Sequence, residues 1–122
     1  IAQFKDAGIR VSVFLDPVVE QVDAAKKCGA DRIELYTEAY AAGYNTNKEE
    51  AISSYKETAK RATELGIGIN AGHDLSLENL RYFVHEIPEI LEVSIGHALI
   101  SDALYLGLNN TVQMYKEQLM NY

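Results

Sequence analysis

Two of the three histidines in the sequence occur in the same local context. His73 follows Gly72 at the end of an apolar run, and His97 follows Gly96 at the end of another. An imidazole titrates near neutral pH, so His73 is a candidate proton donor or acceptor. Glycine lets backbone N–H groups approach a ligand closely, and His97 begins a helical pattern whose free N–H groups favour an anion. We therefore expect His73 to act through its side chain and His97 through its backbone.

Glu34 is the third candidate, because it lies in the middle of a strand pattern between Ile33 and Leu35. A carboxylate inside a fold is costly unless it is paired or functional. Arg32, two residues earlier on the same strand face, offers a structural ion pair, but we favour a catalytic role for Glu34. By the same alternation, Asn70 lies on the face of the sheet that Glu34 shares, where it can orient either a ligand or Glu34.

Other interpretations of these residues stay open. The two Gly-His pairs can arise by chance, with both imidazoles bonded only to loop carbonyls. Tyr36, Tyr40 and Tyr44 surround the segment 38–47 and fit either a lid or ordinary packing. No lysine lies on a predicted strand, so a Schiff-base mechanism has no candidate nucleophile. The sequence contains no Walker A motif and no metal-binding motif, so we expect no metal site.

Four β-rich runs position these residues, at 9–16, 31–37, 66–73 and 91–96. Helices are predicted at 17–28, 48–65, 77–86, 97–106 and 109–119, with a loop at 38–47 and Ser76 as the N-cap of the third helix. Strands that alternate with helices predict right-handed βαβ units and a parallel sheet. Both Gly-His pairs then lie at the carboxyl edge of that sheet.

Alternation within the strands separates two kinds of parallel sheet. Val13, Ile33, Ile69 and Val93 belong to one apolar face, whereas the opposite face is largely polar or small. An open doubly wound sheet has two apolar faces. One apolar and one polar face instead predict a (β/α)8 TIM barrel, with helices outside and the active site at the carboxyl ends of the strands. Such a barrel needs about 250 residues, so we expect 1–122 to form half of one domain.

The composition limits the classes of function. The chain has 122 residues, 48% of them hydrophobic, and a net charge of −7, which disfavours nucleic-acid binding. No apolar run reaches the length of a transmembrane helix. The single Cys28 fits a reducing cytoplasm. The chain opens without Met on the end of a predicted helix stopped by Gly8, so we expect a preceding segment and no signal peptide.

Four segments carry a family resemblance: 11–16, 33–37 with Tyr40-Ala41, 70–73 and 95–100. In this order and spacing the sequence resembles the C-terminal half of the pyridoxine 5′-phosphate synthase (PdxJ) family. The resemblance implies a transferase that condenses 3-amino-2-oxopropyl phosphate with 1-deoxy-D-xylulose 5-phosphate, giving pyridoxine 5′-phosphate, phosphate and water. It also implies a TIM barrel with extra helices, a homo-octamer, and no metal or organic cofactor.

The resemblance assigns roles residue by residue. His73 corresponds to a catalytic proton donor and Glu34 to a residue that stabilises the transition state. Asp74, Gly96 and His97 correspond to the binding site for the aminoketone phosphate. Asp74 and Glu38 stand where the family commonly has Gly. The family's remaining catalytic residues and most of its second phosphate site lie in an N-terminal half, which would be needed to complete the barrel.

Two alternatives remain. One is another phosphate-binding barrel enzyme, such as an isomerase. The other is a half-barrel that is inactive alone and that dimerises or docks with a separate N-terminal half, because four units leave open strand edges.

Overall fold

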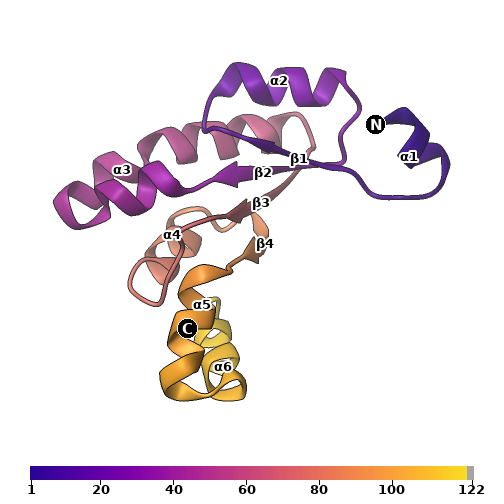
Figure 1. Cartoon of the computed structure of the whole chain (residues 1–122). Helices are drawn as coiled ribbons and strands as arrows, with labels where there is room; N and C mark the ends of the chain where they lie inside the picture. The colour runs from indigo at the N-terminus through magenta and orange to yellow at the C-terminus, as the bar shows by residue number, and fades with distance from the viewer. Residues whose placement is uncertain (121–122) are drawn as a thin grey trace.

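The computed structural model describes residues 1–120, so the last two residues of the expected domain 1–122 lie outside the described part (Figure 1). The strands are β1 (Ser12–Leu15), β2 (Arg32–Tyr36), β3 (Gly68–Gly72) and β4 (Ile90–Ser94). The helices are α1 (Ala2–Asp6), α2 (Val19–Lys27), α3 (Glu38–Glu64), α4 (Leu80–Glu86), α5 (His97–Leu106) and α6 (Leu108–Gln118).

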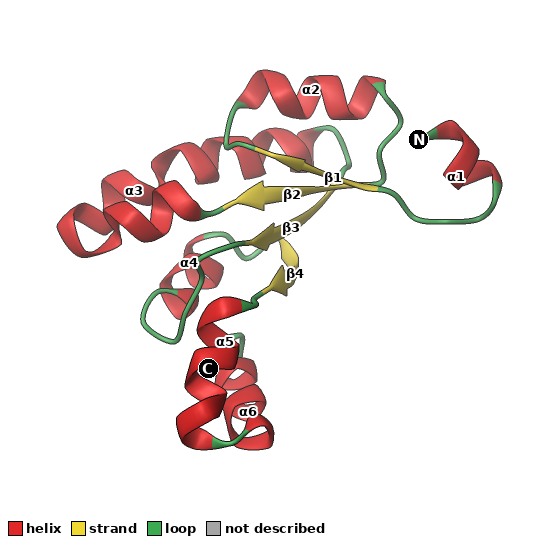
Figure 2. Ribbon diagram, in the orientation of Figure 1, coloured by secondary structure: helices red, strands yellow, loops and turns green. Residues whose placement is uncertain are grey.

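The four strands form one parallel sheet in the order β1-β2-β3-β4, as the alternation of strands and helices predicts. Figure 2 shows α2 and α3 packed along the sheet and the α5–α6 pair beyond β4. Phe14, Glu34, Asn70 and Glu92 are register partners across the sheet and therefore share one face. Sequential parallel strands with helical crossovers are the arrangement of half a (β/α)8 barrel, and the expected fold class is confirmed.

The two faces of the sheet differ as the sequence predicts. Ile33, Leu35 and Ile69 point toward the helices and are at most 1% exposed. Phe14, on the opposite face, is 56% exposed. The core therefore lies between the sheet and its helices, and the face that would line a barrel axis is open.

Helix α3 corrects the predicted boundaries. The expected loop 38–47 is helical, and only Asn47 has non-helical backbone angles (φ −157°, ψ 94°). The Asn47 side chain accepts a hydrogen bond from the Glu50 N–H at 3.1 Å, so it caps the second part of the helix as an N-cap residue does. The boundary predicted near residue 48 is a kink within one long helix.

The start of α4 also differs from the prediction. The helix begins at Leu80 with Asn79 as its N-cap residue, three positions after the predicted start and with Ser76 outside it. The Asn79 side chain instead accepts a hydrogen bond from the Ser76 N–H at 2.9 Å. A tight turn over 76–79 therefore replaces the first turn of the predicted helix.

The tyrosines near α3 are mainly structural. Tyr40 is fully buried, with its ring 4.8 Å from that of Phe83, and Tyr44 packs 5.5 Å from Tyr40. Of the two interpretations left open, packing holds for Tyr40 and a lid does not, because its hydroxyl donates to the Asn79 carbonyl inside the core. Within residues 1–120, no helix has both the length and the apolar character needed to span a membrane.

Candidate active site

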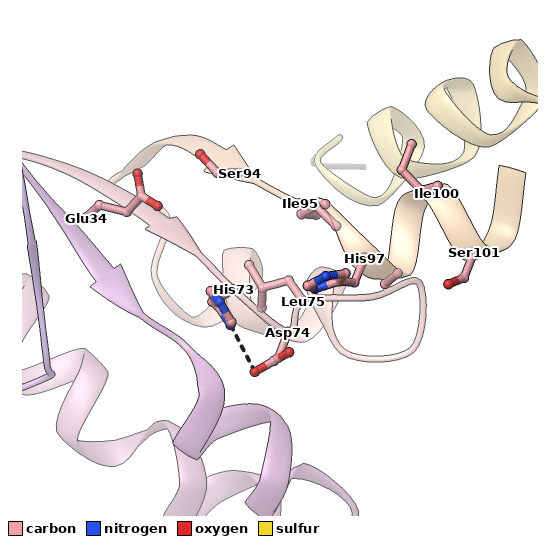
Figure 3. Close-up of a pocket in the computed structure, with 11 residues that line it drawn as sticks. Glu34, His73, Asp74, Leu75, Ser94, Ile95, His97, Ile100 and Ser101 are labelled. Atoms are coloured by element: carbon pink, nitrogen blue, oxygen red, sulfur yellow. Dashed lines mark hydrogen bonds and ion pairs between the residues drawn. The ribbon is translucent and has the colours of Figure 1, made fainter.

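A cavity of about 1040 Å³ lies at the carboxyl ends of β2, β3 and β4 (Figure 3). All five residues expected at the site line it: Glu34, His73, Asp74, Gly96 and His97. Its remaining lining comes from Leu75, Ser94, Ile95, Ala98, Ile100 and Ser101. The structure thus brings the candidates together at the edge where barrel enzymes place their active sites, while their individual roles stay predictions.

The Glu34 carboxylate reaches this cavity from the middle of β2. No hydrogen bond or ion pair of its side chain occurs within the described part of the chain. Gly72 makes room for it, since a Cβ built on Gly72 would lie 2.5 Å from Glu34 Oε1 and 3.1 Å from the Ser94 carbonyl oxygen. Glu34 is therefore available to a ligand.

The alternative interpretation, an ion pair between Arg32 and Glu34, is not what the structure shows, because Arg32 pairs with Glu92. Arg32 Nη1 lies 2.8 Å from Glu92 Oε1, on the far side of β3. The path between them is clear because Gly68 has no side chain, and a Cβ there would lie 2.9 Å from Arg32 Cγ. Arg32 therefore reaches β4 instead of turning along its own strand.

Glu92 is the centre of this network, and sequence reasoning missed it. Arg10 Nη2 lies 3.2 Å from its Oε1. Asn70 accepts from Arg32 at 3.1 Å and donates to Glu92 Oε2 at 3.1 Å. Desolvation alone would raise the pKa of Glu92, but the charges of Arg10 and Arg32 outweigh it and hold that pKa below its ordinary value. Both ends of the Asn70 amide are occupied, so the role suggested for Asn70 in orienting Glu34 is not what the structure shows.

The loop after β3 has an unusual backbone. His73 has φ 86° and Asp74 has φ 55°, the left-handed region that side chains other than glycine rarely adopt. Thr37, fully buried, holds this loop. The Thr37 hydroxyl lies 2.8 Å from the Gly72 carbonyl oxygen and also within hydrogen-bonding distance of the His73 carbonyl. The Thr37 N–H donates a hydrogen bond to the Gly72 carbonyl at 3.1 Å. Thr37 directly follows β2, a position at which sequence reasoning assigned no role.

The His73 imidazole contacts side chains on two sides. Its Nδ1 lies 3.2 Å from Asp74 Oδ2, the contact drawn as a dashed line in Figure 3. The Tyr36 ring packs edge-on at 5.0 Å, and Phe14 packs against Tyr36 at 5.2 Å. The imidazole is half-exposed, so it is both restrained and open to the cavity.

Tyr36 is the aromatic wall of the site. Its hydroxyl donates to Glu38 in the first turn of α3. This hydrogen bond, with desolvation and the charges of Glu38, Asp74 and Asp16 adding to it, raises the pKa of Tyr36 to about 12. Tyr36 therefore stays a neutral phenol at physiological pH and fixes the ring against His73.

Helix α5 begins at the cavity. Gly96 is its N-cap residue, no side chain caps it, and its first turn contains no acidic residue. The first N–H groups of a helix have no partner within the helix, and the positive end of the helix dipole favours an anion. A Cβ on Gly96 would meet no atom within 4 Å, so this glycine leaves open space at the helix start. The helix start predicted at Gly96 and His97 is confirmed, and anion binding there stays a prediction.

Within residues 1–120, no three side chains of His, Cys, Asp or Glu gather closely enough to form a metal site. The expectation of a reaction without a metal or organic cofactor stays a prediction.

Known proteins resemble this chain over almost its whole length. The sequence model of the family described as "Pyridoxal phosphate biosynthesis protein PdxJ" matches residues 1–121. A pyridoxine 5′-phosphate synthase of Cytophaga hutchinsonii is 61% identical over 119 residues, which cover 98% of this chain and 50% of that protein. A protein of the same name from Flavobacterium johnsoniae is 58% identical over 119 residues, which cover 98% of this chain and 50% of that protein. Another, from Bacteroides thetaiotaomicron, is 62% identical over 114 residues, which cover 93% of this chain and 48% of that protein. The chain spans about half the length of these curated relatives, and it belongs to the PdxJ family.

Proposed function

We propose that residues 1–122 are the C-terminal half of a TIM barrel that acts as a pyridoxine 5′-phosphate synthase. One observation carries this proposal: the five residues assigned by the family resemblance line a single cavity at the carboxyl edge of the sheet. The proposed reaction condenses 3-amino-2-oxopropyl phosphate with 1-deoxy-D-xylulose 5-phosphate. A cytoplasmic homo-octamer that needs no metal or organic cofactor belongs to the same proposal.

The start of α5 is proposed to bind the phosphate of the aminoketone. Its uncapped N–H groups and dipole favour a dianion, and no acidic side chain lies in its first turn. The Asp74 carboxylate would repel a phosphate, so its backbone N–H is the group proposed to contribute to binding. Its carboxylate lies beside His73 instead.

His73 and Glu34 are proposed to carry out the chemistry. Carbonyl condensation followed by loss of water requires several proton transfers, and His73 would donate protons to the leaving oxygens. Glu34, which has no cationic partner within residues 1–120, would stabilise positive charge that develops on the substrate. Both groups need the N-terminal half of the barrel to enclose the substrates.

A hybrid enzyme tests this proposal directly. Residues 1–121 would replace the matching half of the Cytophaga hutchinsonii protein, whose identity of 61% favours correct assembly. We expect the hybrid to form pyridoxine 5′-phosphate from the two precursors. His73→Asn in the hybrid should cut turnover while phosphate binding is kept. A folded hybrid without synthase activity would contradict the proposed function, and unchanged turnover in His73→Asn would contradict the role of His73.

One observation favours a second candidate for the chain by itself, a non-catalytic half-barrel that assembles with another copy or another half. Phe14 and Leu91, 56% and 59% exposed, lie on the open axis side of the sheet. Light scattering of the isolated chain tests this candidate: a dimer or larger assembly supports it, whereas a folded monomer contradicts it.

A further inference from the structure

We propose that Asp74 is a positioning residue for His73: its carboxylate holds the hydrogen on Nδ1 and turns Nε2 of the imidazole toward the cavity. The catalytic part of this proposal rests on the proposed function, since it requires His73 to transfer a proton. The orientation of the ring is a property of the chain itself and can be measured without any reaction.

The contact itself defines which nitrogen carries the hydrogen. His73 Nδ1 lies 3.2 Å from Asp74 Oδ2, and both residues line the cavity (Figure 3). A carboxylate can only accept a hydrogen bond, so Nδ1 must be the donor. In the neutral ring the lone pair is then on Nε2, and in the protonated ring Nε2 carries the proton that can be given away.

The backbone fixes this pair more firmly than a contact between two exposed neighbours would suggest. The His73 carbonyl accepts from the Thr37 hydroxyl, and the Asp74 carbonyl accepts from Asn79 Nδ2 at 3.3 Å. Thr37 and Asn79 are both buried. With the peptides on both sides of Asp74 held, its backbone dihedral angles and the direction of its Cα–Cβ bond are fixed.

The left-handed backbone makes the presence of an aspartate informative. Glycine adopts a φ of 55° without strain, whereas a side chain in this region strains the backbone, for aspartate less than for most residues. Backbone geometry alone would therefore favour glycine at position 74. The Asp74 side chain contacts the imidazole, and this contact offsets the strain of the backbone at position 74.

A second wall limits the other motion of the ring. Tyr36 packs edge-on against His73 at 5.0 Å, and its own hydroxyl is bound by Glu38. The imidazole is thus held by a hydrogen bond at one nitrogen and by an aromatic edge. Nε2 is left as the nitrogen that has no partner within residues 1–120.

Nitrogen NMR of the isolated chain tests the orientation. The sequence has three histidines, so the ¹⁵N-imidazole spectrum is simple, and His73→Asn identifies the signals of His73. We expect the wild type to show a protonated Nδ1 and an unprotonated Nε2 for neutral His73. Asp74→Gly, which suits the backbone and lacks the carboxylate, should shift His73 toward a mixture of tautomers. The same tautomer population in wild type and Asp74→Gly would overturn the proposal.

The hybrid enzyme tests the catalytic consequence. A general acid contributes roughly 10²–10⁴-fold to a rate, so a freely turning ring should lower kcat by about tenfold or more. Asp74→Gly should show this loss with the KM for the aminoketone phosphate unchanged or lower, because a negative charge has been removed. Asp74→Asn, which keeps an oxygen acceptor, should retain part of the rate. A rise in KM without loss of kcat would contradict positioning, whereas an inactive wild-type hybrid would contradict only the proposed function and leave the NMR result valid.

Discussion

Thr37→Val should destabilise the protein and release the loop that carries His73. Thr37 follows β2 in the N-cap position of α3, where a threonine hydroxyl ordinarily bonds the first turn of its own helix. Here the hydroxyl makes no such bond and reaches the carbonyls at the end of β3 instead. The substitution keeps the branched shape of the side chain and removes only the donor.

The size of the expected loss in stability depends on which carbonyl oxygens lose a hydrogen-bond donor in Thr37→Val. The Gly72 carbonyl keeps the hydrogen bond from the Thr37 N–H at 3.1 Å, whereas the His73 carbonyl loses the hydroxyl. A lost hydrogen bond costs about 1 kcal/mol, and a carbonyl left without a partner costs more when water cannot reach it. His73 is exposed, so water compensates in part. We therefore expect a loss of about 1–2 kcal/mol in the free energy of unfolding.

Helix α3 should survive this change, because a different residue serves its N-terminus. The Tyr55 hydroxyl accepts from the Tyr40 N–H at 3.3 Å and donates to the Tyr36 carbonyl at 2.7 Å. Amide exchange in the first turn of α3 should therefore stay close to wild type in Thr37→Val. The Asp31–Ile33 region, far from the loop along β2, should also be unaffected.

Urea unfolding is the assay. With a slope of about 2 kcal/mol/M, the expected loss lowers the midpoint by about 0.5–1 M. Thr37→Ser, which keeps the hydroxyl, should stay much closer to wild type. A Thr37→Val midpoint equal to that of wild type, or a loss that Thr37→Ser shares in full, would refute the assignment of Thr37 as the anchor of the His73 loop.

Three further outcomes are expected. The Asp31 carboxylate accepts a hydrogen bond from the Val11 N–H at 2.8 Å, which lowers the pKa of Asp31 below 3.8. The stability that this adds is present at neutral pH and is lost as the pH falls through the lowered pKa, so the urea midpoint of Asp31→Asn should decline less in acid than that of wild type. The hydrogen bond from Tyr36 to Glu38 stabilises the fold below about pH 10, and this stability is lost as the pH rises toward 12. In an alkaline absorbance titration, the difference between wild type and Tyr36→Phe should therefore show one phenol that ionises near pH 12. Phe83 is fully buried, and Phe83→Ala should cost about 3–5 kcal/mol in a denaturation curve.

The arrangement of the sheet could be predicted because its faces follow from a period of two. Ile33 and Leu35 point one way and Glu34 the other in any strand. Parallel register then aligns Glu34 with Asn70 and with Phe14, so all three residues lie on the face opposite the helices. The gathering of His73 and His97 at one edge follows from the same rule, since both come directly after a strand.

The partner of Arg32 could not be predicted, because it depends on a register shift between β3 and β4. Ile69 pairs with Ile90 but Asn70 pairs with Glu92, which leaves Leu91 as an extra residue in a bulge. Simple alternation places Leu91 with the outward-facing residues of its strand. In the structure its side chain lies beside Gly68 on the axis side, with Cδ1 3.1 Å from the position of a Cβ built there.

The availability of Glu34 is a consequence of that same shift. Arg32 and Glu34 share a strand face, and an ion pair between them would leave the carboxylate neutralised beneath the cavity. Glu92 instead lies level with Asn70 and 2.8 Å from Arg32, while Arg10 supplies a second cation to the same carboxylate. Two positive charges are thus gathered around Glu92, and Glu34, the next carboxylate along the face, has no cation beside it within residues 1–120. The pairing of Glu92 therefore leaves the Glu34 carboxylate free for the role proposed for it.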